Sequence, residues 1–333
     1  VRLNESNGYA IGIDLGNMAE EGSYMVGVIT DLSGRVITRI EKERAKDSMD
    51  KIIDKSMTLI EELINKKAVA KDKIKGVGIG IGGVIDENLG TVRDSTKNGI
   101  RTSYISLKGL IEQKFGFPSF LGNDATFAAL GEKTYSLPID IEDVIYMYSD
   151  VGSGIIIKGG IYCGASGSAG EIRINYPRNG DYLKYSKNFS FLLPLGLDLG
   201  ILSNAQRLIQ EEGIKSTISE KVNNKLDKLK VDHIIESAKA GDTFAIELLE
   251  DAAVNLGVRA AYLVNLFNPE IVIIGGGIEK AGSLFLEPLR RTVRKWAFEE
   301  QSNVVKIIPA QLGKDSVALG AASVVIRDVF IKA

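Results

Sequence analysis

Cysteine and histidine are almost absent from this 333-residue sequence, which contains one of each, Cys163 and His233. A structural zinc site needs four such ligands, so zinc fingers, zinc ribbons and thiolate clusters are excluded. A single cysteine cannot form an internal disulfide, which fits a reducing cytoplasm. Oxygen ligands are plentiful, so a carboxylate Mg²⁺ site stays open.

A strong charge excess and a long hydrophobic run are also missing. The 41 Lys and Arg residues nearly balance the 43 Asp and Glu residues, giving a net charge of −2, whereas nucleic-acid binders usually show a basic excess. No apolar run approaches the ~20 residues that span a bilayer, and no signal segment opens the sequence. The hydrophobic share of 44% is that of a globular protein, and the length predicts two domains. We therefore expect a cytoplasmic protein without a membrane partner.

Alternating strand and helix patterns predict an α/β protein. In the first half the predicted strands are Tyr9–Asp14, Tyr24–Thr30, Val36–Ile40, Ile74–Ile81 and Pro118–Leu121, with helices at about Ser48–Lys66 and Leu107–Phe115. In the second half the predicted strands are Val144–Ser149, Ile155–Lys158, Ile271–Ile274 and Val304–Ile308, with helices at Ala125–Glu132, Phe244–Leu266, Leu284–Trp296 and Val317–Phe330. The similar order hints at a duplicated α/β unit with mostly parallel central strands and a ligand in the cleft between the sheets. Residues 181–230 are polar, and only short helices and loops are expected there.

The first candidate site residue is Asp14, which ends a predicted strand and is followed by Leu15 and Gly16. A carboxylate there can hold Mg²⁺ through water, and the glycine lets backbone N–H groups approach a phosphate. The same residues also fit a polar strand end before a loop. The local sequence leaves both interpretations open.

Two glycine turns follow strands in the second half. The turn Gly152-Ser153-Gly154 can hydrogen-bond a phosphate oxygen, or it can be an ordinary tight hairpin turn. The turn Gly275-Gly276-Gly277 precedes a helix, where it can admit a nucleotide or sugar to the helix N-terminus, or serve a close strand-to-helix crossing.

Polar side chains at two further places could recognise hydroxyl groups. Asp124 can cap the following apolar helix, or it can be a general base that takes a proton from a sugar hydroxyl. Asn123 beside it could hydrogen-bond a neighbouring hydroxyl. Glu171 could accept hydrogen bonds from two adjacent hydroxyls, or it could be a surface carboxylate. His233 lies in a charged helical stretch, and we expect it at the surface without a chemical role.

Several segments together, in their order and spacing, resemble one known family. They are Ile11-Gly12-Ile13-Asp14-Leu15-Gly16, Gly78–Asp86, Gly122-Asn123-Asp124-Ala125, Gly131-Glu132, Asp150–Gly154, Gly164–Glu171 and Ile273–Gly277. From Tyr9 to about Phe330 the sequence resembles the ROK family of sugar kinases and sugar-responsive transcriptional repressors. The resemblance implies two α/β domains of the sugar kinase/actin-like ATPase (ribonuclease H-like) fold, with sugar in the interdomain cleft.

The resemblance also implies site residues. Asp124 corresponds to the catalytic base of the family's kinases. The implied sugar contacts are Gly82, Asn98, Asn123, Asp124 and Glu171. The implied phosphate or nucleotide contacts, vestigial in a regulator, are Asp14, Gly16, Gly152, Ser153, Gly154, Gly275 and Gly276. ATP and Mg²⁺ are expected as cofactors only if the protein is a kinase.

The sequence departs from the family's kinases in two loops. After Gly16 no threonine follows, and Glu20 and Glu21 enter the turn where the phosphates of ATP would lie. Two carboxylates repel a triphosphate, which disfavours phosphoryl transfer. The histidine of the family's zinc site is replaced by Ile174, and the downstream cysteine cluster is missing, so no zinc is expected.

The altered loop after Gly16 favours a regulator over an enzyme, whereas the loss of the zinc site does not choose between them, because kinases and repressors of the family both carry it. The sequence starts at Val1, and its first ten residues resemble the junction that follows the winged-helix domain of ROK repressors, although Met removal also explains the start. We expect the effector-binding, dimerising part of a ROK-type transcriptional regulator, which binds a small sugar or sugar phosphate and reaches operator DNA only through a missing N-terminal domain. An ATP-dependent sugar kinase with Asp124 as general base is the alternative. A sugar-binding protein of kinase descent without a DNA partner is a third interpretation.

Two domains and self-association are expected. The predicted N-terminal α/β domain covers residues 1–122 and is completed by the C-terminal helix 317–333. A larger C-terminal α/β domain covers residues 123–316. The protein is expected to be a homodimer or a higher homo-oligomer.

Overall fold

The computed structural model describes residues 8–16, 23–44, 49–67, 69–82, 85–86, 90–95, 102–148, 152–172 and 200–332. The chain forms two compact units, each discontinuous in sequence. Unit 1 contains Val1–Glu142, Gly154–Gly170 and Gln311–Ala333. Unit 2 contains Asp143–Ser153 and Glu171–Ala310.

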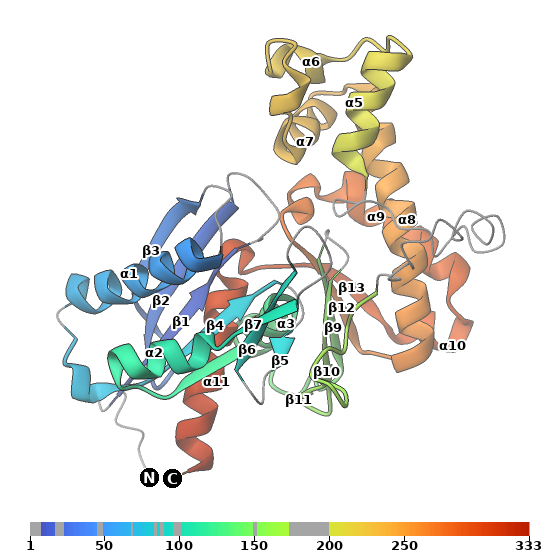
Figure 1. Cartoon of the computed structure of the whole chain (residues 1–333). Helices are drawn as coiled ribbons and strands as arrows, with labels where there is room; N and C mark the ends of the chain where they lie inside the picture. Colours follow the sequence, from blue (N-terminus) through green and yellow to red (C-terminus); the bar gives the residue numbers. More distant parts are fainter. Residues whose placement is uncertain are drawn as a thin grey trace. The chain divides into compact units, whose positions relative to one another are not determined.

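The first five-stranded sheet has the strand order β3-β2-β1-β4-β8. Its strands are β1 (Tyr9–Asp14), β2 (Ser23–Asp31), β3 (Val36–Arg44), β4 (Ile74–Ile81) and β8 (Ser119–Asn123). Strands β1, β2 and β3 form an antiparallel meander, whereas β4 is parallel to both β1 and β8 (Figure 1). The carboxyl ends of the three parallel strands therefore meet at one edge of the sheet.

The second five-stranded sheet repeats this plan in the order β11-β10-β9-β12-β13. Its strands are β9 (Val144–Tyr148), β10 (Ser153–Ile157), β11 (Gly160–Ile161), β12 (Ile271–Gly275) and β13 (Lys306–Pro309). Strands β10 and β11 are antiparallel, and β12 is parallel to both β9 and β13. In both sheets the first strand in sequence is central, the next two extend to one side and the last two to the other. The repeated order confirms the α/β class and agrees with the duplicated unit that the sequence suggested.

A third sheet is antiparallel and was not predicted from the sequence. It consists of β5 (Ile85–Asp86), β6 (Thr91–Ser95) and β7 (Thr102–Ile105). Its strands are short and carry no regular alternation of polar and apolar residues, which is the main sequence signal of a half-buried strand.

Four helices pack on the first sheet. They are α1 (Met49–Lys67), α2 (Leu107–Phe115), α3 (Asp124–Tyr135) and α11 (Ser316–Ile331). The side chains of β1 point alternately to its two faces. Ile11 and Ile13 belong to the same buried cluster as Ile52 and Ile60 of α1. Ala10, from the opposite face of β1, belongs to a cluster with residues of α11. The apolar residues of α1 recur at helical spacing because one side of this helix packs on the sheet.

Glycines allow α11 to pack directly on backbone. A Cβ atom on Gly12 of β1 would lie 1.9 Å from the Ala318 carbonyl oxygen, and one on Gly320 of α11 would lie 1.8 Å from the Phe127 carbonyl oxygen. Real Cβ atoms do not approach so closely, so the sheet, α11 and α3 can contact each other only through hydrogen-only side chains. The alternating glycines of the first half therefore have a packing role.

Six helices build most of the part of unit 2 that the structure describes. They are α5 (Ile201–Glu211), α6 (Thr217–Lys221), α7 (Val231–Lys239), α8 (Thr243–Phe267), α9 (Ser283–Trp296) and α10 (Glu299–Val304). The predicted long helix agrees with α8 within one residue at each end. The predicted strand Val304–Ile308 was wrong at its start, because Val304 ends α10 and β13 begins at Lys306.

Two sequence expectations bear on the helices. His233 is not merely a surface residue, because its Nδ1 accepts the Lys230 N–H at 3.1 Å and thereby caps the start of α7. Helix α3 groups with unit 1, whereas the sequence analysis assigned it to the C-terminal domain. Its packing gives the reason, since a Cβ atom on Gly131 would lie 2.1 Å from the Ser316 carbonyl oxygen. The domain boundaries given above, 1–122 with 317–333 and 123–316, remain a prediction.

Candidate functional site

The parallel strands of the first sheet bring predicted site residues to one edge. In the strand register Asp14 lies opposite Gly80, and Ile81 lies opposite Asn123. Asp14, Gly82 and Asn123 therefore stand at the carboxyl ends of three adjacent strands, β1, β4 and β8. In parallel α/β sheets this edge is where ligands bind.

Asp14 forms a tight turn at its end of the sheet. Its Oδ1 accepts the Gly16 N–H at 2.8 Å, and the Leu15 N–H donates to the Gly80 carbonyl oxygen at 3.0 Å. Gly16 has a positive φ of 70°, a conformation that favours glycine. The turn fixes a half-buried carboxylate at the strand end, which is the donor type that Mg²⁺ prefers. A water-mediated Mg²⁺ contact therefore fits Asp14 chemically.

Two adjacent residues, Asn123 and Asp124, accept backbone N–H groups at the start of α3. The Oδ1 atom of Asn123 accepts the Ala125 N–H at 2.9 Å and the Thr126 N–H at 3.4 Å, so Asn123 is the N-cap of α3. Asp124 is the first helical residue, and its Oδ1 also accepts the Ala125 N–H, at 2.8 Å. The capping role that the local sequence offered to Asp124 thus belongs mainly to Asn123.

The other oxygen of Asp124 faces the end of β4. A Cβ atom on Gly82 would lie 3.1 Å from Asp124 Oδ2, a tight contact. A side chain at residue 82 would therefore require the Asp124 carboxyl group to shift by a few tenths of an ångström. The carboxyl group also stands at the N-terminus of α3, where the helix dipole stabilises negative charge.

The predicted residues in and beside the second sheet form a different group. Gly152 and Glu171 are partners in an isolated antiparallel bridge, and the Tyr148 N–H donates to the Gly152 carbonyl oxygen at 2.9 Å. Ser153 is only 2% exposed. A Cβ atom on Gly154 would lie 2.1 Å from the Ala125 carbonyl oxygen, so this glycine also has a packing role.

The turn after β12 contains a carboxylate that the sequence analysis overlooked. The Gly277 N–H donates to Glu279 Oε2 at 2.7 Å. Gly276 and Gly277 both have positive φ, and a Cβ atom on Gly275 would lie 1.8 Å from the Tyr146 hydroxyl oxygen. An acidic side chain two residues after a glycine turn is the signal that could have revealed this contact. In this conformation Glu279 therefore occupies the backbone N–H of Gly277.

Some predicted residues lie outside the described part of the chain. These are Asn98, Glu20, Glu21 and Ile174. Within the described part, no group of three or more His, Cys, Asp or Glu side chains could hold a metal ion. The same part contains no helix that is long and apolar enough to cross a bilayer.

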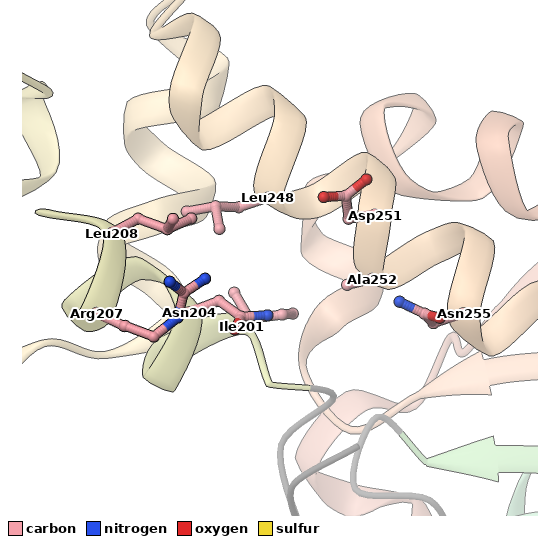
Figure 2. A pocket seen from close by; sticks show the side chains of 8 residues that line it. All are labelled: Ile201, Asn204, Arg207, Leu208, Leu248, Asp251, Ala252 and Asn255. Carbon is pink, nitrogen blue, oxygen red and sulfur yellow. The ribbon is translucent and has the colours of Figure 1, made fainter. Parts of the chain in front are cut away.

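A cavity of about 130 Å³ lies between α5 and α8 (Figure 2). Its lining is Ile201, Asn204, Arg207, Leu208, Leu248, Asp251, Ala252 and Asn255. Arg207 already pairs with Glu212 at 3.3 Å. The pair is exposed, so it adds little stability. None of the residues discussed above lines this cavity.

Comparison with known proteins establishes the fold and the family. A solved structure of a ROK family transcriptional regulator, a homologue of the Escherichia coli MLC protein, matches with a TM-score of 0.76 at 22% identity, over 98% of this chain and 79% of that chain. The two mixed sheets thus form the sugar kinase/actin-like ATPase fold. The ROK family model matches residues 10–177 and 207–328, and the chain therefore belongs to the ROK family.

The relatives of this chain include proteins named as repressors and proteins named as sugar kinases. A xylose repressor from Caldicellulosiruptor bescii is 30% identical over 332 residues, which cover 99% of this chain and 81% of the repressor. A glucokinase from Thermotoga maritima is 27% identical over 323 residues, which cover 95% of this chain and 96% of the kinase.

Proposed function

We propose that this chain is the sugar-sensing, effector-binding and dimerising region of a ROK-type transcriptional regulator that acts in the cytoplasm. Its ligand is a small sugar or sugar phosphate. The sugar-binding part of the proposal rests mainly on the arrangement at the carboxyl edge of the first sheet, and the choice of a regulator rests on Glu20 and Glu21. There the Asp124 carboxyl group faces Gly82, while Asn123 satisfies the first N–H groups of α3.

The geometry supports recognition of hydroxyl groups. Asp124 supplies carboxyl oxygens, and Asn123 supplies an amide group on the adjacent residue. A sugar hydroxyl donates to a carboxylate and accepts from an amide N–H, so this pair suits two neighbouring hydroxyls. The assignment of Asn98 and Glu171 to the same sugar stays a prediction.

Regulation requires more than binding. The sugar must have different affinities for two conformations of the protein, since a ligand that binds both equally shifts neither. DNA would be bound through a separate N-terminal domain, because the net charge of −2 gives this chain no basic excess for a polyanion.

An ATP-dependent sugar kinase is the second candidate, and the presence of Asp124 favours it. In that function Asp124 would take the proton of the attacking hydroxyl, and Asp14 would hold Mg²⁺ through water. Two observations oppose it. Glu20 and Glu21 add negative charge to the turn after Gly16, and Glu279 accepts the N–H of Gly277. Glu20 and Glu21 would repel a triphosphate, and a ligand could use the Gly277 N–H only if the contact of Glu279 were broken.

Calorimetric titration with a panel of pentoses, hexoses and amino sugars tests sugar sensing. We expect one sugar class to bind wild type, and Asp124→Ala to weaken its affinity by about tenfold or more, because about 1.4 kcal/mol corresponds to a factor of ten. Ser106→Ala is the matched control, since Ser106 caps α2 by accepting the Gly109 N–H at 3.3 Å. That variant should lower the melting temperature and leave sugar affinity unchanged.

The titration can also contradict the assignment. If folded Asp124→Ala binds the sugar as tightly as wild type, Asp124 serves only the start of α3. If no sugar of the panel binds wild type, the sensing function itself is wrong.

A further inference from the structure

Both five-stranded sheets end in outer strands whose backbone groups could pair with another chain. In the part of the chain that the structure describes, β3 and β8 are the outer strands of the first sheet, and β11 and β13 are those of the second. Strand β11 has only two residues and offers little length for pairing. The other three are four to nine residues long. An unprotected edge of such length is a template for an added strand or for aggregation.

The hydrogen bonds of β13 identify the residues that face outward. The Lys306 and Ala310 N–H groups donate to carbonyl oxygens of the segment Glu270–Ile274, at 2.9 and 2.8 Å. The backbone groups of successive residues point to opposite sides of a strand in a parallel ladder. Ile307 and Pro309 therefore direct their backbone groups away from β12.

These outward positions are closed. The Ile307 carbonyl oxygen accepts two N–H groups of the Arg290 guanidinium, from Nε at 3.0 Å and from Nη2 at 2.6 Å. Pro309 has no N–H, and proline within a sheet is confined to places where the missing donor faces outward. One residue before the strand, the Val305 N–H donates to the Gln301 carbonyl oxygen of α10 at 3.1 Å. An approaching strand would thus meet an occupied acceptor between two positions that offer it no donor.

A second contact orients Arg290. It lies on α9, and its Nη1 donates to Glu287 Oε1 at 2.6 Å, three residues earlier on the same helix. Only 29% of its side chain is exposed. Hydrogen bonds from a charged donor are stronger than those from a neutral one, so the neutral N–H of an added strand would replace Arg290 only at a cost in free energy.

The outer strands of the first sheet carry contacts of the same kind. The Pro118 carbonyl oxygen bonds to β4, so the next residue, Ser119, directs its N–H away from β4 and donates it to Glu112 Oε1 of α2 at 2.9 Å. On β3 the Arg39 carbonyl oxygen accepts a hydrogen bond from Lys66 Nζ of α1 at 3.0 Å. On all three strands a charged side chain from a neighbouring helix takes a backbone group, the cations on carbonyl oxygens and the carboxylate on an N–H.

We propose that Arg290, Glu112 and Lys66 close the sheet edges, so that neither a second copy of this chain nor an extended peptide can lengthen either sheet. Arg290 should have the largest effect, because it binds one carbonyl oxygen with two N–H groups and Pro309 lies two residues further on. The inference goes beyond the proposed function and does not depend on sugar binding.

Aggregation kinetics at matched stability test the role of Arg290. Arg290→Met removes the donors and keeps an apolar side chain. Thr292→Val is the control, because it removes the hydrogen bond from the buried Thr292 hydroxyl to the Pro288 carbonyl oxygen, at 2.9 Å, without touching the edge. Urea concentrations are chosen so that all proteins have the same free energy of unfolding. Arg290→Met should then form thioflavin-positive aggregates about tenfold faster than Thr292→Val, a factor that corresponds to about 1.4 kcal/mol.

Two further variants separate edge closure from a general loss of stability. Arg290→Lys keeps a cationic donor and should recover most of the protection. Pro309→Val, combined with Arg290→Met, supplies an outward N–H and should accelerate aggregation further, with the infrared signature of intermolecular β-sheet. Equal rates for Arg290→Met and Thr292→Val, or aggregates without that signature, would overturn the proposal.

Discussion

At the scale of single residues, adjacent acidic and amide groups carry distinct tasks in this protein. Asn123 satisfies N–H groups of α3, and this leaves one oxygen of Asp124 directed at Gly82. Glu132, which lies eight residues after Asp124 in α3, is almost completely buried at 1% exposure. Its Oε1 accepts the Gln311 N–H at 2.9 Å and the Leu312 N–H at 2.8 Å. The carboxyl group thus fixes the chain just before α11.

Removal of the Glu132 side chain should be strongly destabilising. Glu132→Ala leaves two backbone N–H groups of the Gln311–Leu312 segment without their acceptor, and each such loss costs about 1–3 kcal/mol. We expect the free energy of unfolding in urea to fall by about 2–6 kcal/mol, the sum of the two losses. Glu132→Gln keeps one acceptor oxygen and should lose less than half as much.

The matched control is Glu247→Ala, because Glu247 is exposed on α8. Its effect should stay within about 0.5 kcal/mol. Equal losses in Glu132→Ala and Glu132→Gln would show that the acceptor oxygen is not what stabilises the segment.

The sequence predicted which residues stand at the start of α3 but not their individual roles. Asn and Asp are almost equally good N-caps, so two adjacent candidates leave the helix start uncertain by one residue. The contact between Asp124 and Gly82 depends on strand register, which links residues more than forty positions apart and leaves no local signal. Glu279 is a different case, because its partner, the Gly277 N–H, is only two residues away and the local signal was overlooked.

At the scale of elements, helix starts also bind neighbouring elements together. Asp242 caps α8 by accepting the Ala245 N–H at 3.0 Å through Oδ1. Its Oδ2 accepts hydrogen bonds from the Thr217 N–H and the Thr217 hydroxyl, both at 2.7 Å, and from the Ser216 hydroxyl at 2.8 Å. One carboxylate therefore joins α6 to the start of α8. Burial by itself would raise the pKa of Asp242, but the hydrogen bonds from these groups outweigh it and hold the pKa below its ordinary value.

The contribution of Asp242 to stability should vanish in acid. A carboxylate whose pKa is lower in the folded protein than in the unfolded chain stabilises the fold above the unfolded pKa, about 4, and loses that contribution as the pH falls through the folded pKa. Asp242→Asn keeps a capping oxygen but removes the negative charge, and it should cost about 1 kcal/mol at pH 6, because hydrogen bonds to a charged acceptor are stronger than those to a neutral one. The difference from wild type should shrink as the pH falls below about 4. Urea unfolding of both proteins from pH 6 to pH 3 measures it, and a constant difference would contradict the charge-based account.

Elements with strong periodicity were predictable, and those without it were not. Helix α8 and strands β1 and β4 follow clear apolar patterns, and their predicted bounds agree closely with the structure. Strands β5, β6 and β7 lie in a polar stretch where tertiary pairing decides the conformation. The glycines of β1 and β4 were interpretable only once α11 was known to lie on them, because the close contacts involve residues from opposite ends of the sequence.

At the scale of the whole molecule, the order of weak motifs predicted more than any one of them did. Their spacing led to the ROK family and to the fold, both of which the comparisons establish. The choice between regulator and kinase could not be predicted with the same strength, since relatives named as a repressor and as a glucokinase both match nearly the whole chain. We base the choice on Glu20 and Glu21, which add negative charge to the turn after Gly16.

The most direct test is therefore ADP release with the sugar that binds in the titration. Wild type, supplied with ATP, Mg²⁺ and that sugar in a coupled assay, should show no appreciable turnover, because added carboxylates disfavour the triphosphate while the hydroxyl-binding edge is retained. Asp124→Asn is the paired variant, and it should be as inactive as wild type. Turnover of about 1 s⁻¹ or more, in the ordinary range of enzymes and abolished in Asp124→Asn, would contradict the regulator and establish a kinase with Asp124 as its base.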